Sequence, residues 1–289
     1  MRIASLLPAA TEICCALGLG DQLVGVSHEC DYPPHVAELP RLTRTRLAPG
    51  LDSAAADAAV RRHAAEGLSL YEVDEGQLRA VRPDLVITQD TCSACAVDLA
   101  EVRRGLGRVT GISTELLSLT PSTLTEVWAS FVEVGEASER SAVAAAVVEG
   151  LRDRLERVAA EAAGHRRVRT LFLEWLDPPM PPGHWTPELL RFIGADPVVS
   201  YEGGPTRATP WPELERSRPE VVLLAPCGYS IGQTYAELER APPRLAALLA
   251  STPHAVLDGN AYFNRPGPRL VEGVEIAARI VHDNLGDAF

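Results

Sequence analysis

"VRPDLVITQDTC" (residues 81–92) and "SRPEVVLLAPCG" (residues 217–228) follow one pattern, and this pattern decides the fold. In each stretch, Arg-Pro and an acidic residue precede a short apolar run, and a loop with a cysteine follows. Proline ends a helix and favours an extended residue before it, while an unbroken apolar run is typical of a strand buried on both faces. Two such units in different halves of the chain predict two similar lobes.

Further apolar runs alternate with segments of helical spacing. The expected strands are 2–7, 23–27, 84–88, 108–112, 168–174, 220–225 and 254–258, and the amphipathic segments between them include 96–106 and 235–250. Near the N-terminus, "ATEICCALGLG" (10–20) predicts a helix that opens at Thr11 and is stopped by glycine. This alternation favours parallel strands with crossover helices, which is an α/β protein.

Residues 138–167 are rich in Ala, Leu, Glu and Arg, and they predict one long helix between the lobes. The fold class predicted is α/β, with two Rossmann-like lobes joined by a long helix. We divide the chain into an N-terminal lobe (1–117), a helical linker with the long spanning helix (118–166) and a C-terminal lobe (167–289). In open α/β sheets, ligands bind beyond the carboxyl ends of the strands, so the loops that follow the strands form the expected site.

Composition excludes several classes of function. The net charge is −12 and the basic residues do not cluster, which argues against nucleic-acid binding. All 27 basic residues are arginine, so no lysine can form a Schiff base or hold a phosphate in a P-loop. No apolar run of about 18 residues predicts a membrane span. Pro8 and Glu12 interrupt the apolar N-terminus, which predicts a cytoplasmic protein with reduced cysteines, or a periplasmic or surface-anchored one if a leader was removed.

The ordered set of strand-end segments resembles the class III periplasmic binding proteins, and most closely the vitamin B12-binding proteins of ABC importers. The resemblance rests on "IASLLPAATEICCALGLGDQLVGVSHECDYPP", "VRPDLVI", "PWPELERSRPEVVLL" and "YFNRPGPRLVEGVEIAARIV", and it covers nearly the whole chain. It implies a small ligand held between two lobes, with cobalamin or a related corrinoid as the first candidate. It also implies an ABC permease as partner if the protein is exported. Residues 41–75 look like an insertion relative to the simplest members.

The residues expected to contact the ligand lie in loops after strands. Aromatic rings there would stack on a flat corrin or tetrapyrrole, and the polar groups would orient it or act as acids and bases. For His28 the alternatives are a metal ligand, a base for a nearby thiol, or a ring that only bonds backbone. For Trp185 and Phe263 the alternative is packing at the edge of a lobe, and for Arg265 it is tying the last helix to the sheet. The full set is His28, Glu29, Asp31, Gln89, Glu174, Trp175, His184, Trp185, Tyr229, Tyr262, Phe263 and Arg265.

Four cysteines suggest a second hypothesis, a cytoplasmic enzyme on the same fold. Cys92 and Cys95 have the spacing with which two thiolates reach one metal, and Cys30 and Cys227 lie in other strand-end loops. Four thiolates suit zinc or an iron–sulfur cluster, and a single one could act as a nucleophile. The alternative is that these small side chains fill apolar space. Cys14 and Cys15 lie within the first expected helix and are interpreted as packing residues.

Overall fold

A computed structural model describes residues 1–89, 102 and 114–284, and the chain forms two compact units. The N-terminal unit comprises Met1–Leu51, Ala58–Pro121 and Trp128–Val148, and the C-terminal unit comprises Asp52–Asp57, Ser122–Val127 and Glu149–Phe289. The long helix is α6 (Ser141–Ala162), and the border between the units falls inside it. The predicted α/β class with two lobes and a long helix is confirmed.

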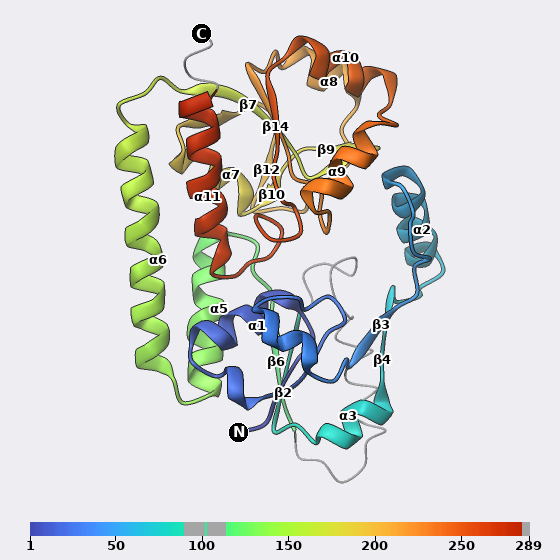
Figure 1. The fold of residues 1–289 in the computed structure, drawn as a ribbon, viewed down its shortest axis with the longest axis vertical. Coiled ribbons are helices and arrows are strands. Elements are labelled where there is room, and N and C mark those ends of the chain that lie inside the picture. The colour runs from blue at the N-terminus through green and yellow to red at the C-terminus, as the bar shows by residue number, and fades with distance from the viewer. Residues whose placement is uncertain (90–101, 103–113, 285–289) are drawn as a thin grey trace. The chain divides into compact units, whose positions relative to one another are not determined.

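The N-terminal unit is built on a parallel sheet of four strands (Figure 1). Their order is β2 (Leu23–Val26), β1 (Ile3–Ser5), β5 (Leu85–Gln89) and β6 (Glu115–Leu119). Every residue of β1 and β5 is buried, as expected for central parallel strands with both faces covered. The chain order reverses between β1 and β5, so a ligand crevice is expected where these strands end.

The C-terminal unit repeats this arrangement. The order of its parallel sheet is β11 (Ala195–Pro197), β7 (Val168–Leu173), β13 (Val221–Leu224) and β14 (His254–Val256). The strands β5 and β13, which come from the two halves of the sequence repeat, both lie beside the first strand of their unit. The order reverses between β7 and β13, which places the second expected crevice at Leu173 and Leu224.

The described residues also form small two-stranded ribbons and further helices. The ribbons are β3 (Thr43–Thr45) with β4 (Tyr71–Val73), β8 (Trp175–Leu176) with β9 (Pro179–Met180), and β10 (Gly183–His184) with β12 (Tyr201–Glu202). The remaining α-helices are α1 (Pro8–Ala16), α2 (Ser53–Ala65), α3 (Glu75–Val81), α5 (Leu124–Ala137), α7 (Thr186–Phe192), α8 (Trp211–Arg216), α9 (Ile231–Leu238), α10 (Pro243–Ser251) and α11 (Arg269–Arg279). Short helical turns occupy Gly20–Gln22, Pro34–Glu38 and Ile280–Asn284. Within the described ranges, no helix has the length and apolar character needed to cross a bilayer.

Several elements differ from the prediction. The helix α1 begins at Pro8 and not at Thr11, while its end before Gly18, whose φ is 72°, is as predicted. The segment 235–250 is two helices, because Pro242 and Pro243 lack the amide protons that a helix interior needs. The strands β6 and β11 were not predicted, and the expected strand 108–112 lies outside the described residues.

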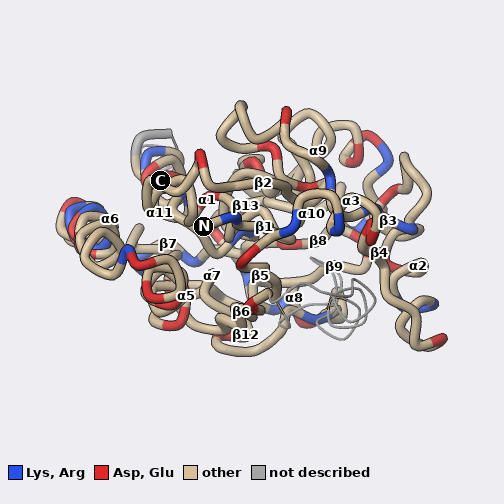
Figure 2. The backbone as a smooth tube through the Cα atoms, turned by 90° about the horizontal axis from the view of Figure 1, so that it is seen from below, with Lys and Arg blue, Asp and Glu red and all other residues tan. Residues whose placement is uncertain are grey.

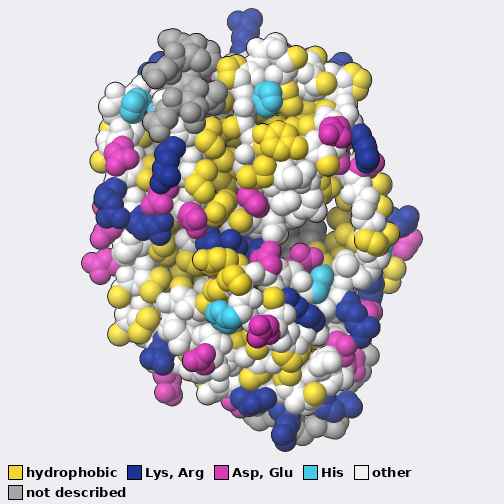
Figure 3. Space-filling view, in the orientation of Figure 1, with side chains coloured by type: hydrophobic (Ala, Val, Ile, Leu, Met, Phe, Trp, Pro, Cys, Tyr) yellow, Lys and Arg dark blue, Asp and Glu magenta, His cyan; other side chains and the backbone are white. Residues whose placement is uncertain are grey.

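An ion pair joins α6 to α11 in the C-terminal unit. Arg154 donates from Nε and Nη2 to the two carboxylate oxygens of Glu275, at 2.8 and 2.7 Å. Figure 2 shows basic and acidic positions interleaved along α6, and Figure 3 shows charged side chains of both signs side by side over this helix. The mixed charge is typical of a solvated helix face held by ion pairs.

Candidate functional site

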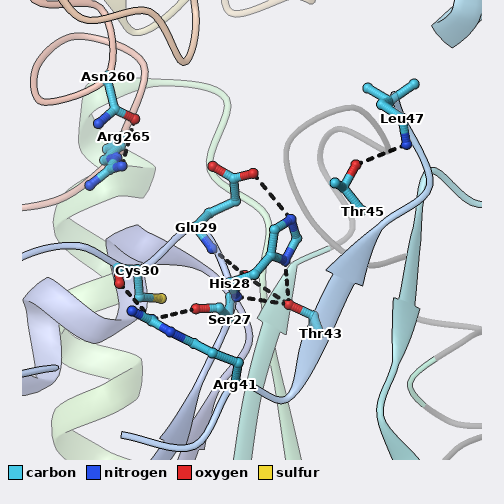
Figure 4. A network of polar contacts seen from close by, with 10 residues as sticks. All are labelled: Ser27, His28, Glu29, Cys30, Arg41, Thr43, Thr45, Leu47, Asn260 and Arg265. Atoms are coloured by element: carbon cyan, nitrogen blue, oxygen red, sulfur yellow. Dashed lines mark hydrogen bonds and ion pairs between the residues drawn. The ribbon is translucent and has the colours of Figure 1, made fainter. Parts of the chain in front are cut away.

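The loop that follows β2 holds the first group of predicted site residues (Figure 4). The ring of His28 is fixed on one side, because its Nδ1 lies 2.7 Å from Thr43 Oγ1 and its backbone amide donates to the same oxygen at 3.1 Å. The Thr43 hydroxyl in turn donates to Ser27 Oγ at 3.0 Å. The ring of Tyr71 packs against the imidazole with the ring centroids 5.2 Å apart. Thr43 and Tyr71 come from β3 and β4, so the segment 41–75 shapes this site.

The backbone of the same loop is held by Arg41 and by the thiol of Cys30. Arg41 donates to the carbonyl oxygens of Ser27 and Cys30, at 3.0 and 2.7 Å. The Cys30 sulfur lies 3.1 Å from Thr11 Oγ1, and the residue Cys30 is 1% exposed. This burial favours the packing alternative for Cys30.

The other predicted residues of the N-terminal unit lie at different depths. Asp31 is exposed, and Gln89 is buried as the last residue of β5, at the carboxyl edge of the sheet. The predicted ligands Cys92 and Cys95 lie outside the described residues.

In the C-terminal unit, Glu174 and Cys227 meet at the point where the strand order reverses. Glu174 follows β7 and Cys227 follows the end of β13. The Cys227 amide donates to the Glu174 carbonyl oxygen at 2.9 Å, so the two loops are joined by their backbones. Glu174 is 7% exposed. The two residues therefore lie at the carboxyl edge of this sheet, where the repeat of the two cysteine loops predicts a site.

Trp175 and Tyr229 form an aromatic pair beside this point. Both side chains are half-buried, and their rings meet edge to face with centroids 5.4 Å apart. Trp175 Nε1 donates to the carbonyl oxygens of Ser53 and Asp177, at 3.1 and 3.2 Å. Ser53 is the first residue of α2, and its amide donates to Glu237 Oε1 at 2.8 Å. The start of α2 is thus bound to the aromatic loops, which the sequence did not indicate.

Several carboxylates lie near this aromatic pair, and they help to raise the pKa of Tyr229 and of Asp177. Burial raises the pKa of Tyr229 to about 12, and the charges of Glu237 and Asp52 add to the effect. Burial also raises the pKa of Asp177, as do the nearby carboxylates of Asp52, Asp57 and Glu237. Tyr229 therefore remains a neutral phenol at physiological pH.

We expect Asp177→Asn to stabilise the protein at neutral pH. The native state binds a proton at Asp177 more tightly than the unfolded state does, so this group lowers stability as pH rises from 3.8 through its raised pKa. Because the side chain is partly solvated, the gain at pH 7 should be below about 1 kcal/mol. Urea unfolding as a function of pH measures it, and the gain should vanish in acid below the unfolded-state value.

Asp74→Asn is the control of opposite sign. Asp74 accepts from the Gln77 amide at 2.9 Å at the start of α3, and this bond lowers its pKa. Its replacement should therefore destabilise at neutral pH. A loss of stability for Asp177→Asn at pH 7 would contradict a raised pKa of Asp177 in the native state.

His184, Trp185 and Phe263 form a tightly bonded group. His184 has a left-handed backbone with φ of 48°, and its ring stacks on Trp185 with centroids 5.5 Å apart. Burial lowers the pKa of His184, and its Nδ1 is a buried atom with no hydrogen bond to any described residue. Trp185 Nε1 donates to the Phe263 carbonyl oxygen at 2.7 Å.

The burial of Trp185 and Phe263 reduces the aromatic surface that was expected to stack on a ligand. Trp185 is 7% exposed and Phe263 is 1% exposed, and the Phe263 ring packs on Phe172 with centroids 5.1 Å apart. The structure places both side chains in the core, which is the packing alternative that the sequence left open. Trp175 and Tyr229 keep accessible surface.

Tyr262 and Arg265 lie on the loop before α11. Tyr262 Oη donates to Glu272 Oε1 at 3.1 Å, and Arg265 donates to Asn260 Oδ1 at 2.7 Å (Figure 4). Arg265 is 8% exposed, and Arg269 is the first residue of α11. The sequence missed Asn260, which no spacing rule singles out.

The cysteine-cluster hypothesis gains no support in the part of the chain that the structure describes. No three His, Cys, Asp or Glu side chains there are arranged to hold a metal ion. Cys14 is fully buried, and burial raises its pKa far above the usual value. Burial raises the pKa of Cys15 to about 11, so neither thiol is a ready thiolate, in agreement with the packing interpretation. Zinc and an iron–sulfur cluster are therefore unsupported.

Comparison with known proteins identifies the fold. No family model matches the chain. The vitamin B12-binding protein of Vibrio cholerae is 24% identical over 278 residues, which is 95% of this chain and 86% of that protein. The crystal structure of the periplasmic vitamin B12 binding protein BtuF of Vibrio cholerae superposes with a TM-score of 0.62 at 23% identity, covering 96% of this chain and 94% of that one. The chain has the class III periplasmic-binding-protein fold.

Two further proteins that are similar to this chain are named for other roles. The periplasmic heme-binding protein BhuT superposes with a TM-score of 0.71 at 19% identity and 98% coverage of both chains. The uncharacterised ABC transporter substrate-binding lipoprotein YvrC of Bacillus subtilis is 22% identical over 288 residues, which is 97% of this chain and 80% of that protein. The resemblance that the sequence predicted is confirmed. These relatives carry names of periplasmic proteins and a lipoprotein, so the expected cytoplasmic location has no support from them.

Proposed function

We propose that this protein binds cobalamin or a related corrinoid. The observation that carries the proposal is the likeness to the vitamin B12-binding protein of Vibrio cholerae, which extends over 95% of the chain in sequence and 96% in structure. No comparison supports the enzyme hypothesis.

The loops at the strand ends suit a large, partly apolar ligand. Trp175 and Tyr229 offer aromatic surface beside Glu174 and Cys227, where the strand order of the C-terminal sheet reverses. Aromatic rings bury much apolar area with few rotatable bonds, and a few polar groups orient the ligand. The neutral phenol of Tyr229 can donate a hydrogen bond to a side-chain amide of a corrin.

Isothermal titration with cyanocobalamin, hydroxocobalamin and adenosylcobalamin tests the proposal. We expect about one ligand per chain with at least one of these forms. The absence of heat with all three, in protein shown to be folded by circular dichroism, would reject corrinoid binding.

Heme is the second candidate, because BhuT superposes with a higher TM-score than BtuF. Hemin is therefore titrated in parallel, with its Soret band as the signal. Saturable binding of hemin together with silence of all three cobalamins would move the assignment to heme.

Trp175→Ala should weaken cobalamin binding about tenfold, because it removes a stacking surface whose aromatic contacts contribute about 0.5–1.5 kcal/mol beyond their area. Trp175→Phe keeps a ring of similar face and loses only the indole hydrogen bonds to Ser53 and Asp177. It is the matched control, and it should retain most of the affinity. Equal affinity of wild type and Trp175→Ala would remove this residue from the site.

The location and partner follow from the same proposal. The named relatives are periplasmic binding proteins and a substrate-binding lipoprotein of ABC transporters. We infer that this protein acts outside the cytoplasm and delivers its ligand to an ABC permease. Fractionation of the native organism, with the ligand-loaded protein detected in the extracytoplasmic fraction, supports this, and recovery only in the cytosol contradicts it.

A further inference from the structure

A cavity of about 300 Å³ lies between α6 and α11 in the C-terminal unit. Figure 1 shows these two helices side by side, and the ion pair of Arg154 with Glu275 joins them. The lining of the cavity includes three guanidinium groups, two imidazole rings and two carboxylates. The chain as a whole has a net charge of −12, so the cavity is more basic than the composition leads one to expect.

Two of the three guanidinium groups are not neutralised by an ion pair. Among the arginines of the lining, the described ion pairs engage only Arg154, which donates to both carboxylate oxygens of Glu275. Arg157 and Arg279 are exposed, and neither forms an ion pair with a described carboxylate. Their charges still reach Glu275, because they add to the bond from Arg154 in lowering the pKa of this carboxyl. One carboxylate therefore faces three cations.

The second carboxylate of the lining, that of Glu161, only partly offsets this charge. Glu161 is exposed, it lies four residues after Arg157 on α6, and it forms no ion pair with a described residue. Three guanidinium groups against two carboxylates leave the cavity with a net positive charge before either imidazole is protonated. An anion can enter without displacing an existing ion pair.

A pair of stacked histidines completes the polar lining. The ring centroids of His165 and His282 are 4.4 Å apart, and the ring planes differ by 26°. His282 Nε2 lies 2.7 Å from the carbonyl oxygen of Ile193. A carbonyl oxygen can only accept, so this nitrogen donates and the ring is fixed. His165 is exposed, and its ring has an N–H that it can donate to a ligand.

The histidine pair lies at the edge of the sheet that the ligand loops do not use. His165 stands three residues before β7, and Ile193 stands two residues before β11, which is parallel to β7. Both residues therefore lie at the amino ends of the strands. Glu174 and Trp175 follow the carboxyl end of β7, where α/β sheets bind their ligands. The two regions are at opposite edges of the C-terminal sheet.

Guanidinium groups suit tetrahedral oxyanions, because their planar fork donates two parallel, charge-assisted hydrogen bonds. The volume of the cavity exceeds that of one phosphate and leaves room for bridging waters, each of which takes about 30 Å³ in the liquid. We propose that the cavity between α6 and α11 binds a phosphate-type oxyanion through Arg157, Arg279 and His165. This is a second site, and it does not rest on the proposed function. An anion bound there stabilises the C-terminal unit, because it binds the native state alone.

Titration with inorganic phosphate at constant ionic strength, followed by the ³¹P nuclear magnetic resonance line width, tests the proposal. We expect saturable binding with a Kd on the order of 1 mM. Arg157→Gln and Arg279→Gln should each weaken it about tenfold, because each removes a charge-assisted hydrogen bond. Arg152→Gln is the matched control, since Arg152 is exposed on the same helix and does not line the cavity. Its phosphate affinity should equal that of the wild type.

Glu161→Gln gives a change of the opposite sign. It removes a carboxylate that repels the anion, so phosphate binding should tighten about threefold. Thermal unfolding provides a second measurement. Phosphate should raise the Tm of the wild type by about 2 °C relative to chloride at equal ionic strength, and it should not raise that of the Arg157→Gln, Arg279→Gln double variant.

Three results would overturn the site. The first is equal phosphate affinity of the wild type and the double variant, both shown to be folded by circular dichroism. The second is the absence of saturation up to about 20 mM phosphate. The third is displacement of phosphate by cobalamin, which would move the anion to the strand-end loops. Because the phosphate titration needs no cobalamin, failure of corrinoid binding leaves its result unaffected.

Discussion

Gly259→Ala is expected to destabilise the C-terminal unit by about 3 kcal/mol, at the upper end of the cost of overpacking. A Cβ atom at this position would lie 2.0 Å from the Pro226 carbonyl oxygen and 2.7 Å from the carbonyl carbons of Ala225 and Pro226. These are backbone atoms of the loop after β13, so no side-chain rotation can relieve the clash. The two loops must separate.

The same separation should weaken ligand binding. The Asn260 amide donates to the Tyr229 carbonyl oxygen at 3.0 Å, and Asn264 Nδ2 donates to the carbonyl oxygens of Ala225 and Gly259 at 3.0 and 2.9 Å. Displacing this loop moves Tyr229 away from Trp175. Urea unfolding gives the loss of stability, and titration with cobalamin at low temperature gives the loss of affinity.

Gly150→Ala is the matched control for this change. Gly150 lies in α6, and a Cβ there meets nothing within 4 Å. Alanine in an open helix position should stabilise by about 0.5–1 kcal/mol, because glycine loses more backbone entropy on folding. The two glycines should therefore respond with opposite signs, and equal unfolding midpoints for the two variants would contradict the close loop contact.

Phe263→Ala is expected to cost about 3–5 kcal/mol of unfolding free energy. The ring is 1% exposed and packs on Phe172, so its loss removes apolar burial and leaves a cavity in the C-terminal core. Chemical denaturation followed by near-ultraviolet circular dichroism measures the change. Phe263→Leu should cost less than half of the unfolding free energy that Phe263→Ala costs.

Tyr235→Ala is the control for aromatic truncation at a surface. Tyr235 is 56% exposed on α9, and its loss should change stability by less than about 0.5 kcal/mol. The contrast also tests the role of Phe263. If Phe263→Ala kept wild-type stability but lost cobalamin binding, the ring would contact ligand, as the sequence first suggested, and the assignment to the core would be wrong.

Local sequence signals predicted the elements whose signals are strong. The Arg-Pro-acid pattern located β5 and β13, and the stretch 138–167, which is rich in Ala, Leu, Glu and Arg, located α6. Where the pattern was weak, prediction failed. The strand β11 contains an aspartate and a proline within three residues, and β6 mixes Glu and Ser with leucines, so neither resembles an unbroken apolar run.

The candidate site was predicted less completely, because its contacts join segments far apart in the chain. The sequence placed His28 in a strand-end loop, but Thr43 and Tyr71 come from the segment that looked like an insertion. The sequence likewise could not show that Ser53, at the start of α2, lies beside Trp175. Such partners are chosen by the packing of the elements and leave no spacing pattern.

The sequence alone determined the α/β class, the two-fold repeat of the lobes and which loops follow the strands, because apolar runs, prolines and breakers act over a few neighbouring residues. Only the tertiary structure showed which aromatic and polar residues of those loops are exposed and which are buried. Trp175 and Tyr229 keep exposed surface, while Phe263 is buried in the core. Burial and the choice of hydrogen-bond partner depend on what the rest of the fold brings to each side chain, and these two properties decide which residues can meet a ligand.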